Sequence, residues 1–431
     1  MSKVLIIGGG FAGASVAKEL ERSTSRTELD VTLLNRENYM LFTPMLPEVA
    51  TGSIESRHVV QPLRVALRKT TFELGDASAV DLAKRTVSVT HPLVKQSKTL
   101  KYDHLVLAMG SHISMHGIAG AQEHSLPLRT VADAASLRDH VIGVLEVAAV
   151  TKDLAARDRL LRFVIVGGGF NGVEVAGELR GFLRDVMRFY PQIKPENASV
   201  VIINEGERLL KELPPKFGKA AAQSLFERNI EIRLQQQVDG IDAEGVALKN
   251  GTRLESRTVI WSTGDAPSPL IKQLDLRTSK HGAIVVGSDF SVPGHPGVWA
   301  LGDCASVPKE DGGFYPPLAQ NAVREGPRLA RNLMNVLSGK PTKPFAYRVL
   351  GMMASLGDRQ GLVELPGGRM LTGTPAWLLW RTYYLSRLPG LYRKVRVAAD
   401  WTLEMFFPRD ISSLGSSPGA RYDGEMDALT A

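Results

Sequence analysis

The sequence predicts an α/β protein with two Rossmann-like dinucleotide-binding domains and a C-terminal amphipathic helical segment. The two domains are predicted because one motif occurs twice, at residues 4–20 and 163–179: an apolar run, a Gly-x-Gly-x-x-Gly turn and a helix-like stretch. In such a unit the first glycine allows a tight turn, the second admits a pyrophosphate, and the third lets helix pack on strand. The helical segment is predicted because tryptophans and basic residues gather at 374–410.

Composition and charge exclude several classes of protein. The chain has 431 residues, of which 44% are hydrophobic and 23% charged, enough for two or three domains with cores of their own. The one cysteine, Cys304, excludes an internal disulfide and the cysteine pair of a disulfide reductase, and we expect it to be a small buried residue. The net charge of +7 is accompanied by no nucleic-acid-binding module and no zinc-ligand spacing, so neither nucleic acid nor metal is expected to bind.

The basic charge favours a membrane surface instead. No stretch of 18 apolar residues could span a bilayer, and the chain enters its first strand without a secretory signal. We therefore expect a peripheral protein bound to an anionic membrane, at the cytoplasmic face of the cell membrane.

The first glycine-rich copy predicts a site for non-covalently bound FAD. Apolar strands at 4–7 and 31–34 flank a crossover helix at 14–21, whose N-terminus would stabilise a pyrophosphate. Asn35 ends the second strand, where a side chain hydrogen-bonds the adenosine ribose; a simple turn asparagine is the alternative.

Three later segments are expected to return to the flavin. The apolar loop at 39–52 is broken by prolines, the strand at 105–111 ends near a glycine, and the strand from 297 ends in a Gly-Asp pair that can accept hydrogen bonds from the ribityl chain. The residues expected to bind FAD are Gly8, Gly10, Phe11, Ala12, Gly13, Asn35, Arg36, Thr43, Pro44, Ala77, Ala108, Gly110, Gly302, Asp303 and Ala319.

The second copy predicts a site for a nicotinamide cofactor that comes and goes. A strand at 199–203 ends at Glu205, which can bond both hydroxyls of an unphosphorylated ribose and would repel a 2′-phosphate, so NADH is favoured over NADPH. Arg208 weakens this argument, since an arginine at this place can bind the 2′-phosphate of NADPH. Glu174 either contacts the nicotinamide or is only a favourable charge near a helix N-terminus. The residues expected to bind NADH are Gly167, Gly169, Phe170, Asn171, Gly172, Glu174, Glu205, Thr263 and Gly264.

Residues 374–410 predict two helices separated at Pro389-Gly390. Trp377, Trp380, Tyr384 and Leu388 fall on one side of the first helix, and basic residues surround them. This pattern suits a membrane headgroup region, with a dimer or domain contact as the alternative. The Ser/Gly/Pro-rich tail at 412–431 is expected to be disordered.

Together these motifs resemble the type II NADH dehydrogenases over residues 1–412. The marks are the Leu41-Phe-Thr-Pro-Met-Leu-Pro47 loop and a C-terminal pattern that ends in Phe406-Phe-x-Arg-Asp410. The family's quinone motif, Ala-Gln-x-Ala-x-Gln, starts here at Ala319, and its second glutamine is replaced by Arg324. The resemblance implies a quinone site at Pro317, Gln320 and Arg324, and it implies Glu174 and Gln320 as the catalytic residues.

The resemblance also implies the reaction. Such a flavoprotein passes a hydride from NADH to FAD and then electrons to a membrane quinone, ubiquinone or menaquinone, without pumping protons. The expected domains are FAD-binding (1–118 and 280–345), NADH-binding (119–279) and membrane-associating (346–411). A soluble FAD-dependent NAD(P)H reductase with a protein acceptor and an NADH-sensing binding protein are the alternatives, and a homodimer is left open.

Overall fold

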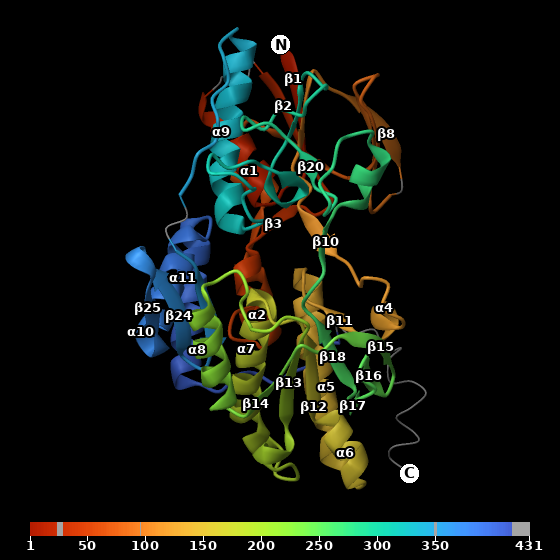
Figure 1. The fold of residues 1–431 in the computed structure, drawn as a ribbon, viewed down its shortest axis with the longest axis vertical. Helices are drawn as coiled ribbons and strands as arrows, with labels where there is room; N and C mark the ends of the chain where they lie inside the picture. The colour runs from red at the N-terminus through yellow and green to blue at the C-terminus, as the bar shows by residue number, and fades with distance from the viewer. Residues whose placement is uncertain (24–28, 95, 349–350, 416–431) are drawn as a thin grey trace. The chain divides into compact units, whose positions relative to one another are not determined.

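The computed structural model describes residues 1–23, 29–94, 96–348 and 351–415, which form two compact units (Figure 1). The first unit comprises residues 1–41, 60–112 and 265–348, and the second comprises 42–59, 113–264 and the chain from 351 onward. Each unit contains one of the two glycine-rich motifs, so each contains one of the predicted dinucleotide sites.

A parallel five-stranded sheet forms the centre of the first unit, with strand order β21-β9-β1-β2-β5. Its strands are β1 (Ser2–Ile7), β2 (Leu29–Asn35), β5 (Thr71–Leu74), β9 (His104–Leu107) and β21 (Val298–Ala300). The apolar residues of β1 and β9 are buried, as parallel strands covered on both faces require. The strands predicted at 4–7 and 31–34 are therefore confirmed.

Two helices of the first unit, α1 (Phe11–Ser23) and α9 (Ala319–Leu337), lie side by side (Figure 1). Gly326 allows their close approach, because a Cβ atom there would lie 2.5 Å from the Ser15 Cβ and 3.0 Å from the Val16 nitrogen. Smaller elements complete the unit: β3 (Tyr39–Leu41), β4 (Val60–Pro62), α3 (Leu63–Ala66), the antiparallel sheet of β6 (Asp76–Asp81), β7 (Thr86–Thr90) and β8 (Ser97–Lys101), and the short pair β20 (Ile284–Val285) and β22 (Ala305–Ser306).

The second unit contains another parallel five-stranded sheet, in the order β11-β18-β12-β13-β14. Its strands are β11 (Leu126–Pro127), β12 (Arg162–Val166), β13 (Ser199–Asn204), β14 (Ile230–Leu234) and β18 (Thr258–Trp261). Its helices are α4 (Ala121–His124), α5 (Val131–Val150), α6 (Leu154–Leu160), α7 (Phe170–Val186) and α8 (Pro215–Phe226), and a small antiparallel sheet is formed by β15 (Val238–Asp242), β16 (Gly245–Leu248) and β17 (Arg253–Glu255). A 3-10 turn at Met187–Phe189 prolongs α7, which explains the late start of β13.

The C-terminal part belongs to the second unit and contains a sheet that the sequence did not predict. The sheet is formed by β23 (Met353–Gly357), β24 (Gln360–Leu365) and β25 (Arg369–Thr372), and it is followed by α10 (Gly373–Arg387) and α11 (Leu391–Phe406). The predicted break between the two helices at Pro389-Gly390 is confirmed. Glycines place β23 on α7, because a Cβ at Gly177 would lie 1.7 Å from the Leu356 carbonyl oxygen. None of the helices within the described ranges is long and apolar enough to cross a bilayer.

The units also differ from the expected domain boundaries, since residues 113–118 belong to the second unit and residues 265–279 to the first. Residues 42–59 contain the 3-10 turn Thr43–Met45, α2 (Leu46–Ala50) and the 3-10 turn Ser56–His58, and they belong to the second unit. The reason is packing: α2 buries its apolar side chains against α5 and α7. At the start of the tail expected to be disordered, the Ser412 carbonyl accepts a hydrogen bond from Arg138. Residues 416–431 lie outside the described residues, so the expectation stays a prediction.

Candidate functional site

The glycine turn of the first unit contains two glycines that close packing requires and one that faces open space. A Cβ at Gly8 (φ +109°) would lie 2.2 Å from the Ala108 carbonyl oxygen, and one at Gly13 would lie 1.9 Å from that of Gly8. A Cβ at Gly10 would meet nothing within 4 Å. The middle glycine thus leaves a free approach to the N-terminus of α1, which fits a pyrophosphate.

Three neighbouring strands of the first unit end at the same edge of the sheet. β1 ends before Gly8, β9 before Ala108 and β21 before Gly302, and chain order reverses between β1 and β9. The Ser111 hydroxyl donates to an Asp303 carboxylate oxygen at 3.2 Å, and a Cβ at Gly302 would lie 3.0 Å from that of Ala12. The structure therefore brings these predicted residues together at the switch point where such sheets bind dinucleotides.

Asn35 forms hydrogen bonds within its own turn, and its contact with the ribose stays a prediction. Its carbonyl oxygen accepts the Gly9 backbone N–H at 2.8 Å, and its amide nitrogen donates to the Glu37 carbonyl at 2.7 Å. Asn204 does the same in the second unit, where its oxygen accepts the Gly168 N–H at 3.0 Å. Both asparagines hold a glycine turn onto the next strand, so the alternative interpretation of a structural turn residue agrees with these contacts.

The other residues expected at the flavin are more dispersed. Arg36 is exposed just beyond β2, Phe11 and Ala319 open α1 and α9, and Ala77 lies on β6. Thr43 and Pro44 belong to the second unit. Contact between these residues and FAD stays a prediction.

The glycine turn of the second unit repeats the geometry of the first. A Cβ at Gly172 would lie 1.9 Å from the Gly167 carbonyl oxygen, whereas one at Gly169 would meet nothing within 4 Å. Thr263 and Gly264 follow β18, which neighbours β12, and the Ser262 hydroxyl donates to the Val166 carbonyl at 2.9 Å. A second dinucleotide fits this turn. Of the other predicted residues, Phe170 opens α7 and the Asn171 amide donates to the Leu128 carbonyl at 3.2 Å.

The two residues that bear on the choice between NADH and NADPH are held differently. Glu205 is exposed directly after β13, and its carboxylate accepts a hydrogen bond of 2.5 Å from the Gln237 amide. Arg208 is turned back on its own loop, where its guanidinium donates to the carbonyls of Leu213 at 2.6 Å and Lys211 at 2.8 Å. Both side chains thus have partners in the protein: the Glu205 carboxylate has one amide at the strand end, and the Arg208 guanidinium has two carbonyls of its own loop.

Glu174 lies in the second turn of α7 and is buried. Its carboxylate accepts a 3.0 Å hydrogen bond from the Ser355 backbone N–H on β23. Burial, reinforced by the nearby Glu178, raises the pKa of the carboxyl to about 8, so the group is neutral at pH 7. This side chain joins α7 to the C-terminal sheet, and its contact with nicotinamide stays a prediction.

The predicted acceptor residues lie at the start of α9. Pro317 is exposed just before the helix, and the half-buried Gln320 has a side-chain amide with no hydrogen-bond partner in the described part of the chain. The Arg324 guanidinium stacks on the Tyr347 ring, 4.3 Å from its centroid, and donates to the Gln320 carbonyl at 2.7 Å. Tyr347, which fixes this cation in place, has no motif that would have revealed it.

The aromatic stripe predicted at a membrane surface is buried, and this prediction is wrong. Trp377, Trp380 and Leu388 are only 6%, 1% and 1% exposed, because α10 lies on β24. The Arg381 guanidinium stacks on the Trp377 and Trp401 rings at 4.0 and 4.6 Å from their centroids. The exposed apolar stripe belongs to α11 and consists of Leu391, Val395, Ala399 and Leu403 at four-residue spacing, followed by Phe406 and Phe407.

Sequence reasoning also missed a buried ion-pair network in the second unit. Glu404 pairs with both Arg381 and Arg409 at 2.9 Å, and Arg409 reaches Glu178 at 3.3 Å. Glu48 accepts the Trp401 indole N–H at 3.0 Å. The available signal in the sequence was Glu48 and Glu178, two carboxylates among apolar neighbours.

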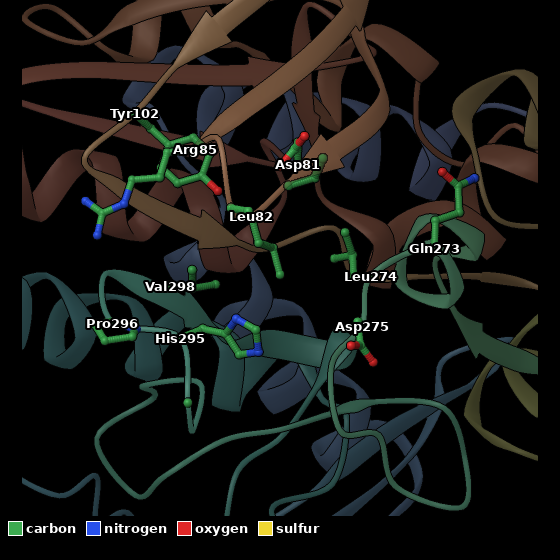
Figure 2. Close-up of a pocket in the computed structure, with 13 residues that line it drawn as sticks. Asp81, Leu82, Arg85, Tyr102, Gln273, Leu274, Asp275, His295, Pro296 and Val298 are labelled. Carbon is green, nitrogen blue, oxygen red and sulfur yellow. The ribbon is translucent and has the colours of Figure 1, made fainter.

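A cavity of about 660 Å³ in the first unit contains none of the predicted site residues. It lies before the amino ends of β9 and β21, where Tyr102 and His295 face it, together with Arg85 and Asp275 (Figure 2). The glycine turn at Gly8–Gly13 follows the carboxyl end of β1 in the same sheet, so this cavity lies at the opposite edge of that sheet.

Comparison with known proteins supplies the family context. Residues 2–326 match the model of the pyridine nucleotide-disulphide oxidoreductases, and residues 349–410 match that of the NDH2 C-terminal domain. A "Probable NADH dehydrogenase" of Dictyostelium discoideum is 32% identical over 95% of this chain and 91% of its own length. The "Type II NADH:quinone oxidoreductase NdhA" of Mycobacterium tuberculosis is 31% identical over 93% and 86%. The solved structure of NDH2 from Plasmodium falciparum with NADH is similar in fold, with a TM-score of 0.89, 20% identity and coverage of 95% and 99%.

Proposed function

Because the chain belongs to the type II NADH dehydrogenases, with FAD and NADH as cofactors, we propose that its first unit binds FAD and its second unit binds NADH. The enzyme is an NADH:quinone oxidoreductase that does not pump protons. The observation that carries this division is the pair of glycine turns, each with a middle glycine facing open space. Family membership favours this function over a soluble reductase with a protein acceptor and over an NADH sensor.

The protein's own residues bind and orient the cofactors. FAD, when bound, supplies the group that accepts a hydride and passes electrons on. The N-terminus of α1 holds its pyrophosphate and Asp303 orients its ribityl chain. Glu205 holds the nicotinamide nucleotide by its ribose and makes NADH the preferred cofactor over NADPH. Arg208 supports this preference, because its guanidinium donates to carbonyls of its own loop. Correct placement of reacting groups contributes several kcal/mol to lowering the barrier.

The acceptor site is proposed at the start of α9. The Gln320 amide, which has no hydrogen-bond partner among the described residues, can donate to a quinone carbonyl, and Pro317 gives the quinone ring an apolar surface. Arg324, fixed by Tyr347, offers a permanent cation where the family has a neutral amide. We expect this cation to change which quinone, ubiquinone or menaquinone, the enzyme prefers.

We further propose that the protein binds peripherally to an anionic membrane, at the cytoplasmic face, through α11. The stripe from Leu391 to Leu403 and the two phenylalanines after it offer exposed apolar area. Arg387 and Lys394 lie near the start of this stripe and add attraction to anionic headgroups.

Two matched variants test the division between the units. The Gly10→Val and Gly169→Val proteins should fold normally, because a Cβ at either position would meet nothing within 4 Å. The valine side chain should nevertheless block the adjoining nucleotide site. We expect Gly10→Val protein to purify without flavin absorbance. Gly169→Val should keep its flavin, which dithionite but not NADH would bleach under anaerobic conditions. Wild-type flavin should be bleached by NADH and re-oxidised by a short-chain quinone; bleaching of Gly169→Val at wild-type NADH concentrations would contradict the proposal.

A further inference from the structure

We propose that Glu325 is a positioning residue that couples FAD binding to proton uptake, through the Gly302-Asp303 turn. The proposal rests on the proposed function, since it takes the first unit to be the FAD site. Glu325 is not among the residues predicted to contact either cofactor or the quinone.

One contact of Glu325 and one of the next residue fix the position of the Glu325 carboxyl. It lies in the second turn of α9 and is 3% exposed, and its Oε2 accepts the Gly302 backbone N–H at 2.8 Å. The next residue, Gly326, lies directly against Ser15 and Val16 of α1, which prevents α9 from shifting. Gly302 has a φ of +72°, so the turn is of a kind that favours glycine and is fixed by this hydrogen bond. The carboxyl therefore sets where the turn, and with it Asp303, is placed.

The electrostatic surroundings of Glu325 contain a carboxylate and no cation among the described neighbours that face it. Asp303 is the charged group that acts on it from the turn, where Cys304 is neutral because burial raises the pKa of its thiol to about 12. Tyr315 lines the same small cavity, and α1 contributes only uncharged residues at this contact. Burial first, and Asp303 second, raise the pKa of Glu325 to about 7. Its ionisation near neutral pH adds a second negative charge to the turn.

Binding of a dinucleotide at this edge changes that balance. The pyrophosphate of FAD is an anion, and Asp303 must stay placed to accept hydrogen bonds from the ribityl chain. FAD binding therefore favours the neutral form of Glu325: the carboxylate takes one proton from solvent, and the protonated carboxyl still offers an oxygen to the Gly302 N–H. By linkage, a rise of one unit in the pKa on binding makes FAD affinity fall about tenfold as pH increases through that range.

The test measures FAD binding to the full-length apoprotein by quenching of flavin fluorescence between pH 6 and pH 9. Wild type should bind about tenfold more weakly at pH 9 than at pH 6. Glu325→Gln, which keeps an acceptor for Gly302 but cannot ionise, should bind with wild-type pH 6 affinity at every pH. Asp289→Asn removes a carboxylate of the same unit that bonds Ser291 and Thr342, and it should keep the wild-type pH dependence.

A second measurement covers the case in which Glu325→Gln fails to fold. Titration calorimetry of wild type with FAD at pH 7.5, in two buffers of different ionisation enthalpy, should report net proton uptake. Absence of uptake, wild-type affinity that is independent of pH, or an equal pH dependence in Glu325→Gln would each overturn the inference alone. Wild-type apoprotein that binds no FAD at any pH would instead overturn the proposed function.

Discussion

At the scale of single residues, Glu174 should make the stability of the protein decrease as the pH rises. Its pKa of about 8 in the fold exceeds the ordinary glutamate value, so the folded state favours the protonated form. The associated stability is complete at low pH and is lost as pH rises toward and through 8. The glutamine of Glu174→Gln cannot ionise. The free energy of unfolding of this variant, relative to wild type, should therefore increase by up to about 1.4 kcal/mol per pH unit as the pH rises from roughly 5 to 8.

Urea unfolding of both proteins across this range provides the measurement. Glu231→Gln, which replaces a half-exposed carboxylate paired with Arg233, is a suitable control and should leave the wild-type pH dependence in place. Parallel curves for wild type and Glu174→Gln would show that the Glu174 carboxyl does not change protonation in the fold.

Residue patterns predicted backbone requirements better than side-chain contacts. The glycines of both turns could be read from spacing alone, because a strand, a tight turn and a close helix leave few alternatives. The contacts of Asn35 and Arg208 could not be predicted from the sequence, because a polar side chain at a strand end can bond a ligand or the neighbouring loop equally well. The available clue was that both second strands end in asparagine, at Asn35 and Asn204, which points to a shared structural role.

At the scale of elements, the C-terminal helices show where periodicity is insufficient. Helical spacing identified α10 and its apolar face, but an apolar face indicates burial without specifying its partner. The partner was the sheet of β23, β24 and β25, whose short strands and glycines gave little signal. Once that sheet is present, the side of α10 with Trp377 and Trp380 packs on it, and α11 provides the exposed apolar face.

The contact between α10 and β24 depends on Gly361. A Cβ there would lie 2.6 Å from the Trp377 backbone nitrogen, so Gly361→Ala should lower the free energy of unfolding by about 1–3 kcal/mol through overpacking. Gly143→Ala adds the same methyl group in open space within α5 and should raise stability by about 0.5–1 kcal/mol. Thermal or urea unfolding distinguishes them, and equal effects of the two substitutions would mean that helix and strand can separate at little cost.

At the scale of the whole molecule, the proposed membrane binding can be tested on the exposed apolar side chains of α11. Val395 and Leu403 are 59% and 56% exposed on α11, and burying such a side chain contributes roughly 1.5–3 kcal/mol. Val395→Ser with Leu403→Ser should therefore weaken sedimentation with anionic liposomes more than tenfold at any salt concentration, while the fold is kept. Phe226→Ser, at a still more exposed apolar position on α8, should leave binding unchanged.

The charge component of the same interaction should depend on salt. Arg387→Glu with Lys394→Glu replaces attraction to anionic headgroups by repulsion, at roughly 1 kcal/mol for each basic residue lost. Its effect should be large at low ionic strength and small at high ionic strength, because exposed charges are screened over about 8 Å at physiological salt. The buried Trp377 and Trp380 provide the opposite case: serine at either position should first destabilise the C-terminal region and loosen binding only as a consequence. Wild-type protein that remains in the supernatant with anionic liposomes at low salt would contradict peripheral binding, and the α11 stripe would then be better tested as a contact between two copies of the chain.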